Sequence, residues 1–441
     1  MLPLTFVFVG LLLFSSTFHL NDALLSTTYL KNTRILPFCQ HESCHTTKQK
    51  IKMVNTEEND QKLPPLTNEE ISRYSRHLIL QDCGMEGQRK LKAASVICVG
   101  TGGLGSPLLM YLAAAGVGRI GLVDDDVVDE SNLQRQIIHG TNWVGKPKID
   151  SAENRILDIN PFCKVEKHME KLTSENALRL LEGYDIVVDG SDNFPTKYLI
   201  NDACAIMNVP CVYGAILGFE GQASVWNYNG GATYRDFLPE PPPPGEIPSC
   251  AEGGVIGILP GVIGCIQATE VVKIILDKGD VLANRILIYD ALAMSFREAQ
   301  VRRSEEANRI NELIDYQGFC GFNTGSNKIE KETENFVRIQ PQEAVKRFEG
   351  GWAPFVLDVR LPQEAEIVRF PFADALLPHR EVASIASQLP RNQDILVHCK
   401  AGGRSATACK ILAENGVKRL YNLEGGILRW AKEIDCSMPL Y

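Results

Sequence analysis

The clearest chemical signal in the sequence is a cysteine placed directly after a short apolar run. Asp394-Ile-Leu-Val-His398 has strand composition, Cys399 follows at once, and the pattern predicts a helix from Ser405 to Glu414. The loop Cys399-Lys-Ala-Gly-Gly-Arg404 can turn successive backbone N–H groups inward, and with the helix N-terminus these favour an anion at its centre. Cys399 is therefore expected to be a stabilised thiolate, able to hold a sulfane sulfur as a persulfide.

A second chemical signal is the glycine-rich turn Gly100-Thr-Gly-Gly-Leu-Gly105, between a β-rich run at Ser95–Val99 and a small, apolar helix from Pro107 to Ala115. The next β-rich run, Arg119–Asp124, ends on an acid about twenty residues after the glycines. Such a turn brings backbone N–H groups and a helix N-terminus up to phosphates. Taken alone, this pattern is more often that of an NAD-dependent oxidoreductase.

Polar and charged residues elsewhere in the same region overturn that interpretation. They are Arg73-Tyr-Ser-Arg76, Ser131-Asn-Leu-Gln-Arg135, Gly145-Lys-Pro-Lys148 and Asp189-Gly-Ser-Asp192-Asn193. Singly, each such residue is more often a solvated side chain or a helix cap. Together, in this order over about 240 residues, they resemble the adenylation domains of the ubiquitin-activating superfamily, close to the bacterial activators of the molybdopterin- and thiamine-pathway sulfur carriers.

This resemblance implies ATP and Mg²⁺ as cofactors. It implies that Asp124 holds the ribose, that phosphates contact Asn132, Arg135 and Lys148, and that Asp192 helps to hold Mg²⁺. The other residues implied at the nucleotide site are Gly103, Ser131, Leu133, Gln134 and Asn193. Arg76 would reach the triphosphate from a partner subunit, which implies a homodimer. Cations are needed because attack of a carboxylate on the α-phosphate joins two anions and expels pyrophosphate.

A second cysteine lies in a loop bounded by proline and glycine, at Cys250-Ala-Glu-Gly-Gly254. A lone cysteine is more often buried packing, but this segment matches the family segment that carries a cysteine beside the adenylate. Cys250 is therefore expected to be a second reactive thiol. Many members of the family also hold a structural zinc with two C-x-x-C pairs, whereas this sequence has none: the matching positions read Thr233-Tyr-Arg-Asp236 and, from Arg302 to Asn311, contain no cysteine. We predict a zinc-free domain; one equivalent of zinc in the purified protein would contradict this.

The C-terminal part carries a second family resemblance. Leu357-Asp-Val-Arg360, the Cys399 loop and Glu424-Gly-Gly-Ile-Leu-Arg-Trp430 together resemble single-domain rhodaneses over about 105 residues. The resemblance implies sulfurtransferase activity, with Arg404 closing the loop and helping to bind the sulfur donor. A phosphatase of related fold is the alternative, and its loop is usually one residue longer.

The elements that position these residues belong to two α/β domains. The sequence predicts a doubly wound, Rossmann-like adenylation domain over residues 60–300, a polar linker over 322–335 and a small α/β rhodanese domain over 336–441. A capping box at Thr67–Glu70 opens a first helix, with Ile71, Tyr74 and Leu78 expected on one face. The other runs that have strand or helix character are 185–189, 210–214, 223–227, 286–289 and 355–359 as strands and 261–276 as a helix.

Composition limits the class of protein. The net charge of −9 argues against a broad nucleic-acid-binding surface, and 13 scattered cysteines in 441 residues do not resemble a small disulfide scaffold. Residues 4–18 are an uncharged apolar run, and from Ala23 to Met53 the only acid is Glu42 among basic, Ser and Thr residues. Residues 1–53 are thus expected to be a signal-plus-transit leader for a plastid; the alternative is a cytoplasmic enzyme whose translation starts at Met53. No membrane segment is expected in the mature form. A fluorescent fusion of residues 1–60 would distinguish these locations.

The two resemblances together imply one reaction sequence. The first domain adenylates the C-terminal glycine of a ubiquitin-like sulfur carrier ending in Gly-Gly, and the persulfide on the second converts it to a thiocarboxylate, for molybdenum cofactor biosynthesis, tRNA thiolation or both. A cysteine desulfurase is the expected sulfur donor. Two alternatives remain open: an activator for protein conjugation without sulfur transfer, and a non-catalytic scaffold that binds nucleotide.

Overall fold

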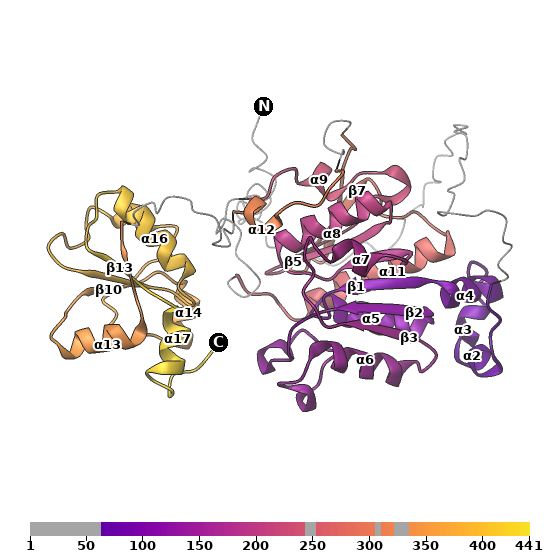
Figure 1. Cartoon of the computed structure of the whole chain (residues 1–441), viewed down its shortest axis with the longest axis horizontal. Helices are drawn as coiled ribbons and strands as arrows, with labels where there is room; N and C mark the ends of the chain where they lie inside the picture. The colour runs from indigo at the N-terminus through magenta and orange to yellow at the C-terminus, as the bar shows by residue number, and fades with distance from the viewer. Residues whose placement is uncertain (1–62, 243–252, 305–309, 322–334) are drawn as a thin grey trace, which may run out of the picture. The chain divides into compact units, whose positions relative to one another are not determined.

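The computed structural model describes residues 63–242, 253–304, 310–321 and 335–441. The expected leader, Cys250 and all of the expected linker except Asn335 lie outside these described residues. Two sheets organise the rest of the chain, an eight-stranded sheet and a five-stranded sheet (Figure 1).

The larger sheet has the strand order β3-β2-β1-β4-β5-β6-β7-β8. Its first five strands in this order are parallel, and β6, β7 and β8 add to β5 as an antiparallel extension. The central strand β1 is buried at every position because helices cover both faces, as is usual for parallel sheets. The strands are β1 (Ser95–Val99), β2 (Arg119–Val123), β3 (Lys164–His168), β4 (Ile186–Asp189), β5 (Cys211–Leu217), β6 (Glu220–Trp226), β7 (Arg285–Asp290) and β8 (Ser295–Gln300).

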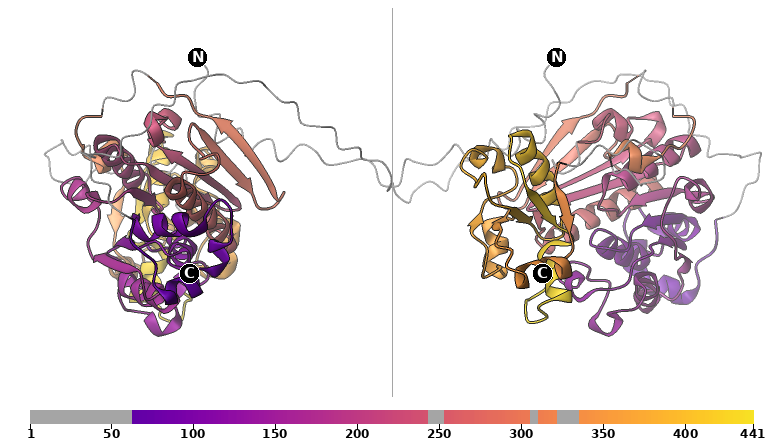
Figure 2. Two further views of the ribbon diagram at one scale, coloured as in Figure 1. Left: turned by 90° about the vertical axis from the view of Figure 1, so that its right-hand side faces the viewer. Right: turned by 60° about the vertical axis from the view of Figure 1, so that its left-hand side comes forward.

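Helices pack on both faces of this sheet, so the chain is doubly wound (Figure 2). One core lies under α5 (Gly105–Ala115), α6 (Lys148–Ile159) and α11 (Ile258–Leu276), and the other lies under α7 (Ala177–Leu181) and α8 (Phe194–Met207). Alternate residues of β1 enter the two cores, with Cys98 in one and Ile97 in the other. The remaining helices are α2 (Asn68–Arg73), α3 (Ser75–Leu78), α4 (Gly84–Ala93), α9 (Tyr234–Phe237) and α12 (Tyr316–Phe319), and short 3-10 turns lie at Glu130–Asn132, Thr141–Trp143 and Tyr228–Gly230.

Among the described residues, α11 alone is long and apolar enough to cross a membrane. It packs against α5, β5 and β6, and Leu259, Ile263 and Val271 along it are completely buried. A core helix of this kind meets the same criteria of length and composition as a membrane span. We therefore assign α11 to the core of the domain.

The first helix differs from the sequence prediction. The capping box is confirmed, since the Thr67 hydroxyl accepts from the N–H of Glu70 and the Glu70 carboxylate accepts from the N–H of Thr67. The expected single helix is instead two, α2 and α3, which meet at Tyr74. Tyr74 is buried and its hydroxyl accepts a hydrogen bond from Asn160, whereas Ile71 is 38% exposed. The prediction of one helix with a single apolar face was wrong, because the helix is interrupted at Tyr74, where Asn160 binds the hydroxyl.

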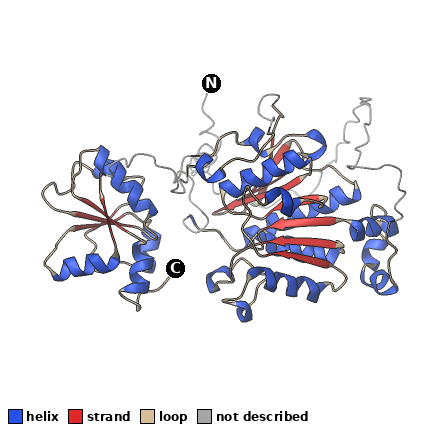
Figure 3. Ribbon diagram, in the orientation of Figure 1, coloured by secondary structure: helices blue, strands red, loops and turns tan. Residues whose placement is uncertain are grey.

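The smaller sheet is entirely parallel, in the order β11-β10-β12-β13-β9. Helices surround this sheet (Figure 3). On one face it is covered by α15 and α16, and on the other by α13 and α17. The strands are β9 (Val337–Ile339), β10 (Phe355–Asp358), β11 (Ala375–Leu376), β12 (Ile395–His398) and β13 (Leu420–Leu423). The helices are α13 (Pro341–Glu349), α14 (Pro362–Ile367), α15 (Val382–Ile385), α16 (Gly403–Glu414) and α17 (Gly426–Glu433).

Candidate active sites

The expected nucleotide-site residues of one chain follow three neighbouring strands. β2, β1 and β4 are adjacent and parallel, so their carboxyl ends share one edge of the sheet. The turn Gly100–Gly105 follows β1, Asp124 follows β2, and Asp192 with Asn193 follows β4. The chain crosses to opposite sides of β1 at this point, where open α/β sheets place their ligands.

The glycine turn is fixed by its own backbone and by Asp124. Gly100 has φ +96°, and a Cβ there would lie 2.8 Å from the carbonyl oxygen of Gly190, so only glycine fits. Asp124 Oδ2 accepts from both the backbone N–H and the hydroxyl of Thr101, at 2.7 and 2.8 Å. The acid expected to hold the ribose therefore also shapes the turn. Sequence reasoning missed Thr101 because no local pattern marks its contact with the second strand.

The polar segment after β2 is a compact turn that presents Arg135. The Asp129 carboxylate accepts from the N–H and hydroxyl of Ser131, and Asn132 completes this cap. Arg135 is half-buried, and its guanidinium donates to the carbonyl of Ser131 at 3.1 Å. Gly103 lies next to the stem of Arg135, which puts the arginine beside the glycine turn.

Lys148 begins α6 and is almost buried. Its ammonium group is 2.8 Å from the carboxylate of Asp126, which is itself 67% exposed. Leu133 is partly buried and Gln134 is exposed in the preceding turn. The structure thus brings Gly103, Asp124, Ser131, Asn132, Arg135 and Lys148 to the same edge of the sheet.

A buried ion pair lies under the segment that follows β4 at this edge of the sheet. Asp189 accepts from the N–H and hydroxyl of Ser191, and its other oxygen lies 2.9 Å from the ammonium group of Lys197. Gln267 of α11 donates to the carbonyl of Asp189. Asp192 and Asn193 stay exposed above this pair, and Asn193 caps α8 by accepting from the N–H of Thr196. In the sequence, the buried role of Lys197 could be suspected only from its place among the mostly apolar residues that form α8.

Arg76 is not brought to this site. It is exposed on α3, and α3 precedes α4, whose end meets the amino ends of β1 and β2 through Ala94 and Gly118. The strands' carboxyl ends, with the nucleotide-site residues, lie at the opposite edge. A role for Arg76 at a nucleotide therefore requires a second copy of the chain, as the sequence prediction states.

His139 is a buried support that the sequence prediction did not include. Its Nε2 is 3.1 Å from the carbonyl oxygen of Thr101 and its Nδ1 is 3.0 Å from the hydroxyl of Ser151. Nε2 must therefore carry the proton, and Nδ1 accepts from Ser151. Burial and the charge of Lys148 lower the pKa of His139 to about 4.

This pKa predicts how stability depends on pH. Below about pH 6.5 the unfolded chain protonates the histidine, whereas the folded domain keeps it neutral until about pH 4. We therefore expect the free energy of unfolding to decrease as the pH is lowered from about 6.5 to about 4. His139→Gln should reduce the slope, which thermal unfolding at a series of pH values would measure. An unchanged slope in the variant would contradict the prediction.

The segments that match the zinc-binding positions of relatives are joined by a carboxylate. Asp236 Oδ2 accepts from the N–H and hydroxyl of Thr233, at 2.8 and 3.1 Å, and its Oδ1 accepts from the N–H of Ser304 at 2.8 Å. Within the described ranges, no group of three or more His, Cys, Asp or Glu side chains could hold a metal ion. The absence of zinc stays a prediction.

Asp236 is expected to stabilise the contact between the segment at Thr233–Asp236 and the segment at Ser304. Asp236→Ala leaves the buried N–H of Thr233 and the N–H of Ser304 without that acceptor, and we expect a loss of about 1–3 kcal/mol in the free energy of unfolding. Denaturant unfolding would measure it. Asp158→Ala, at an exposed helix position, is the control and should change little.

Cys399 lies at the carboxyl end of the central strand β12 of the smaller sheet. Its thiol is buried, accepts from the N–H of Gly402 at 3.0 Å and is 3.4 Å from the hydroxyl of Ser405. Gly402 has φ +95°, and a Cβ there would meet the backbone of Gly425 at 2.9 Å. Of the successive inward N–H groups expected from the sequence, the structure shows that of Gly402 donating to the sulfur.

The Gly-Gly motif after β13 holds the loop from outside. The carbonyls of Cys399 and Lys400 accept from the first N–H groups of α17, those of Ile427 and Leu428, at 2.9 and 3.1 Å. These bonds fix the carbonyls of Cys399 and Lys400 toward α17. A Cβ on Gly426 would lie 2.3 Å from the carbonyl oxygen of Cys399, so the motif is a packing requirement of the loop.

Arg404 closes the loop but is engaged by another residue. Its guanidinium binds both oxygens of Glu364, at 2.6 and 2.7 Å, and both side chains are almost buried. Burial alone would raise the pKa of Glu364, but hydrogen bonds from Arg404 and the N–H of Leu361 lower it. The structure thus shows Arg404 held by Glu364 beside the loop, and its expected contact with the sulfur donor stays a prediction.

Two further buried groups lie below the loop. The guanidinium of Arg360 forms an ion pair with Asp358, and both side chains are fully buried. His398, directly before Cys399, is also fully buried, and burial lowers its pKa to about 4. It is therefore neutral in the folded domain at physiological pH.

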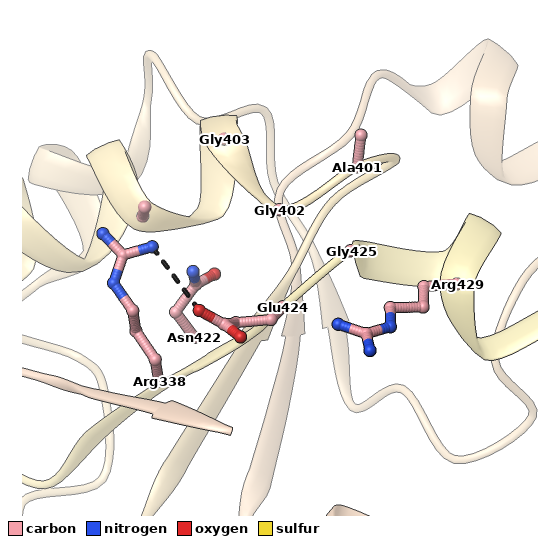
Figure 4. Close-up of a pocket in the computed structure, with 9 residues that line it drawn as sticks. Arg338, Ala401, Gly402, Gly403, Asn422, Glu424, Gly425 and Arg429 are labelled. Carbon is pink, nitrogen blue, oxygen red and sulfur yellow. Dashed lines mark ion pairs between the residues drawn. The ribbon is translucent and has the colours of Figure 1, made fainter. Parts of the chain in front are cut away.

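An open pocket of about 420 Å³ adjoins the Cys399 loop (Figure 4). Ala401, Gly402 and Gly403 form one wall, and two arginines, Arg338 and Arg429, lie around it. Arg338 is 3.8 Å from Glu424, another lining residue. The pocket leaves the backbone of the loop accessible from this side.

The comparison with protein families settles the assignment of both domains. The ThiF family model matches residues 74–310, and the model for the rhodanese-like domain matches residues 340–433. The chain belongs to the ThiF family. This confirms the resemblance drawn from the sequence and the α/β fold class of both domains.

This chain matches several relatives along most of their own length. It is similar to the "Probable adenylyltransferase/sulfurtransferase MoeZ" of Mycobacterium tuberculosis, with 44% identity over 392 residues, covering 86% of this chain and 99% of that protein. The "Adenylyltransferase and sulfurtransferase MOCS3" of Anopheles gambiae is 39% identical over 85% of this chain and 90% of that protein, and that of Sus scrofa is 39% identical over 86% and 90%. This chain is an adenylyltransferase and sulfurtransferase of that type, and its family implies the use of ATP.

Proposed function

We propose that the enzyme activates the C-terminal glycine of a ubiquitin-like sulfur carrier as an acyl-adenylate and converts it to a thiocarboxylate with sulfur held on Cys399. The observation that carries this proposal is the Cys399 loop: a buried thiol that accepts an N–H in a chain whose other domain is an adenylyltransferase. A carrier acyl-adenylate is a good electrophile, and a persulfide is a sulfur nucleophile.

In the adenylation step, the residues at the edge of the larger sheet bind and orient ATP. Asp124 accepts from the ribose, and the N–H groups of the Gly100–Gly105 turn with Asn132, Arg135 and Lys148 contact the phosphates. Asp192, an exposed carboxylate at that edge, suits the preference of Mg²⁺ for oxygen ligands. Mg²⁺ would supply charge neutralisation as pyrophosphate leaves.

In the sulfur-transfer step, the terminal sulfur of the Cys399 persulfide attacks the activated carbonyl and AMP leaves, which gives an acyl disulfide. The Cys250 thiolate then attacks the Cys399 sulfur. This breaks the bond to the carrier's sulfur, releases the thiocarboxylate and leaves a Cys250–Cys399 disulfide, which a cellular dithiol reduces. Cys250 lies outside the described residues. If a Cys250→Ser variant kept full multiple-turnover activity, this last role would be removed.

The proposal includes two protein partners. A cysteine desulfurase persulfide would load Cys399, with thiosulfate as a laboratory substitute. A second copy of the chain would supply Arg76 to the nucleotide site, because Arg76 lies far from that site within its own chain. The proposal needs neither zinc nor a conjugating enzyme.

The test is intact mass spectrometry of candidate carriers ending in Gly-Gly after incubation with enzyme, Mg-ATP and thiosulfate. A gain of about 16 Da, one oxygen replaced by sulfur, is expected for the true carrier. Conjugates of the carrier with other proteins, without thiocarboxylate, would favour the conjugation alternative. No product from any carrier, with ATP–pyrophosphate exchange intact, would overturn the coupling of the two domains.

A further inference from the structure

The residues after α17 return to the sulfur-transfer loop. Met438 and Tyr441 pack with Ile434 and Trp352 against the core of the smaller domain, and Tyr441 is half-buried there. This segment follows the Glu424–Trp430 motif in the sequence. It nevertheless ends in contact with three residues around the Cys399 loop: Arg360, Glu364 and Lys400.

The Tyr441 hydroxyl joins two charged groups beside the loop. It accepts from the guanidinium of Arg360 at 2.7 Å and donates to Glu364 Oε1 at 3.2 Å. Burial raises the pKa of Tyr441 to about 12, so the hydroxyl keeps its proton and can donate. Arg360 is itself fixed by its buried ion pair with Asp358, which makes it a rigid point of attachment.

Tyr441 thereby reaches both ends of the loop. The carboxylate of Glu364 that accepts its proton also binds Arg404, the last loop residue, through both oxygens. The ammonium group of Lys400, the second loop residue, lies 4.6 Å from the centre of the Tyr441 ring, a cation–π distance. Between these two residues stand Ala401, Gly402 and Gly403, which restrain the backbone little.

The hydrogen bond from Gly402 to the Cys399 sulfur depends on the path of this glycine-rich backbone. α17 fixes the loop carbonyls on one side, and the Glu364 and Tyr441 contacts hold its two ends on the other. We infer that Tyr441 is a positioning residue for sulfur transfer, which keeps the Gly402 amide aimed at the Cys399 sulfur by holding Lys400 and the Glu364–Arg404 pair. This inference rests on the proposed function, in which Cys399 carries the sulfur.

The experiment measures thiosulfate:cyanide sulfur transfer by the full-length enzyme and by the variants Tyr441→Ala, Tyr441→Phe and Met438→Ala. Tyr441→Ala removes the ring and hydroxyl, and we expect kcat to fall about 10-fold or more, with little change in KM for thiosulfate. Tyr441→Phe keeps the ring under Lys400 and should lose only a few-fold in kcat. ATP–pyrophosphate exchange should be unchanged in both.

Met438→Ala is the matched control, because Met438 lies in the same segment and packs against the core of the smaller domain. It should lower thermal stability while largely keeping kcat. If Met438→Ala lowers kcat as much as Tyr441→Ala at equal loss of stability, the role of Tyr441 is merely structural and the inference fails. Wild-type kcat in Tyr441→Ala also overturns it. Failure of the proposed function would look different: the wild-type enzyme itself would show no persulfide on Cys399 and no sulfur transfer.

Discussion

Cys399→Ser is expected to abolish thiocarboxylate formation while ATP–pyrophosphate exchange continues at the wild-type rate. A serine hydroxyl fits the same buried position but cannot hold a sulfane sulfur, so the persulfide nucleophile is lost. Thiosulfate:cyanide sulfur transfer should fall about 1,000-fold or more, because removal of a covalent nucleophile leaves only binding and positioning. Activity assays and the mass of the carrier measure these effects.

The control for this variant is Cys436→Ser. Cys436 belongs to the same domain but is exposed, so its replacement should leave both activities intact. Sustained thiocarboxylate formation by Cys399→Ser, over several turnovers, would show that sulfur reaches the carrier without Cys399. That result would contradict the proposed route while leaving the adenylation assignment in place.

Arg135→Ala is expected to give the opposite pattern. The stem of its side chain lies beside the glycine turn, and its guanidinium would neutralise phosphate charge during attack on the α-phosphate. Loss of one such charge should lower the rate of ATP–pyrophosphate exchange about 100- to 1,000-fold. Sulfur transfer from thiosulfate to cyanide should be unchanged, since it does not use the nucleotide site.

The lower rate of ATP–pyrophosphate exchange in Arg135→Ala should not result from a loss of folding stability. Among the described residues, the side chain of Arg135 makes one hydrogen bond, to the carbonyl of Ser131, so the free energy of unfolding should change by about 0.5 kcal/mol or less. Arg155→Ala is the matched control: Arg155 is an exposed arginine on α6, paired with Asp158, and its removal should leave exchange intact. Normal exchange in Arg135→Ala would remove Arg135 from the phosphate site.

Much of the fold could be predicted from the sequence because the central strands and their turns have local signals. The β-rich run of β1, the glycines that follow it and the acid that ends the next run all appear within 30 residues or so. Edge strands were missed, among them β3 and β8, because their exposed positions carry charged residues with no apolar alternation. The single first helix was wrong because Tyr74 is anchored by Asn160, far away in the sequence.

The candidate sites divide in the same way. The residue types expected at phosphates and at the persulfide are visible in short motifs, since a glycine turn before a helix or a cysteine after a strand is a local feature. By itself, the sequence determined two α/β domains, the position of Cys399 after a strand and the residue types of the nucleotide site.

Only the tertiary structure decided what holds those residues in place. It paired Asp189 with the buried Lys197, turned Arg404 to Glu364, placed Arg76 at the opposite edge from the other nucleotide residues and brought Tyr441 to the Cys399 loop. The physical reason is that local patterns record backbone hydrogen bonding and periodic burial, whereas the partner of a buried charge depends on which strands and helices are neighbours. That choice is made by packing of the whole domain, often between residues tens of positions apart.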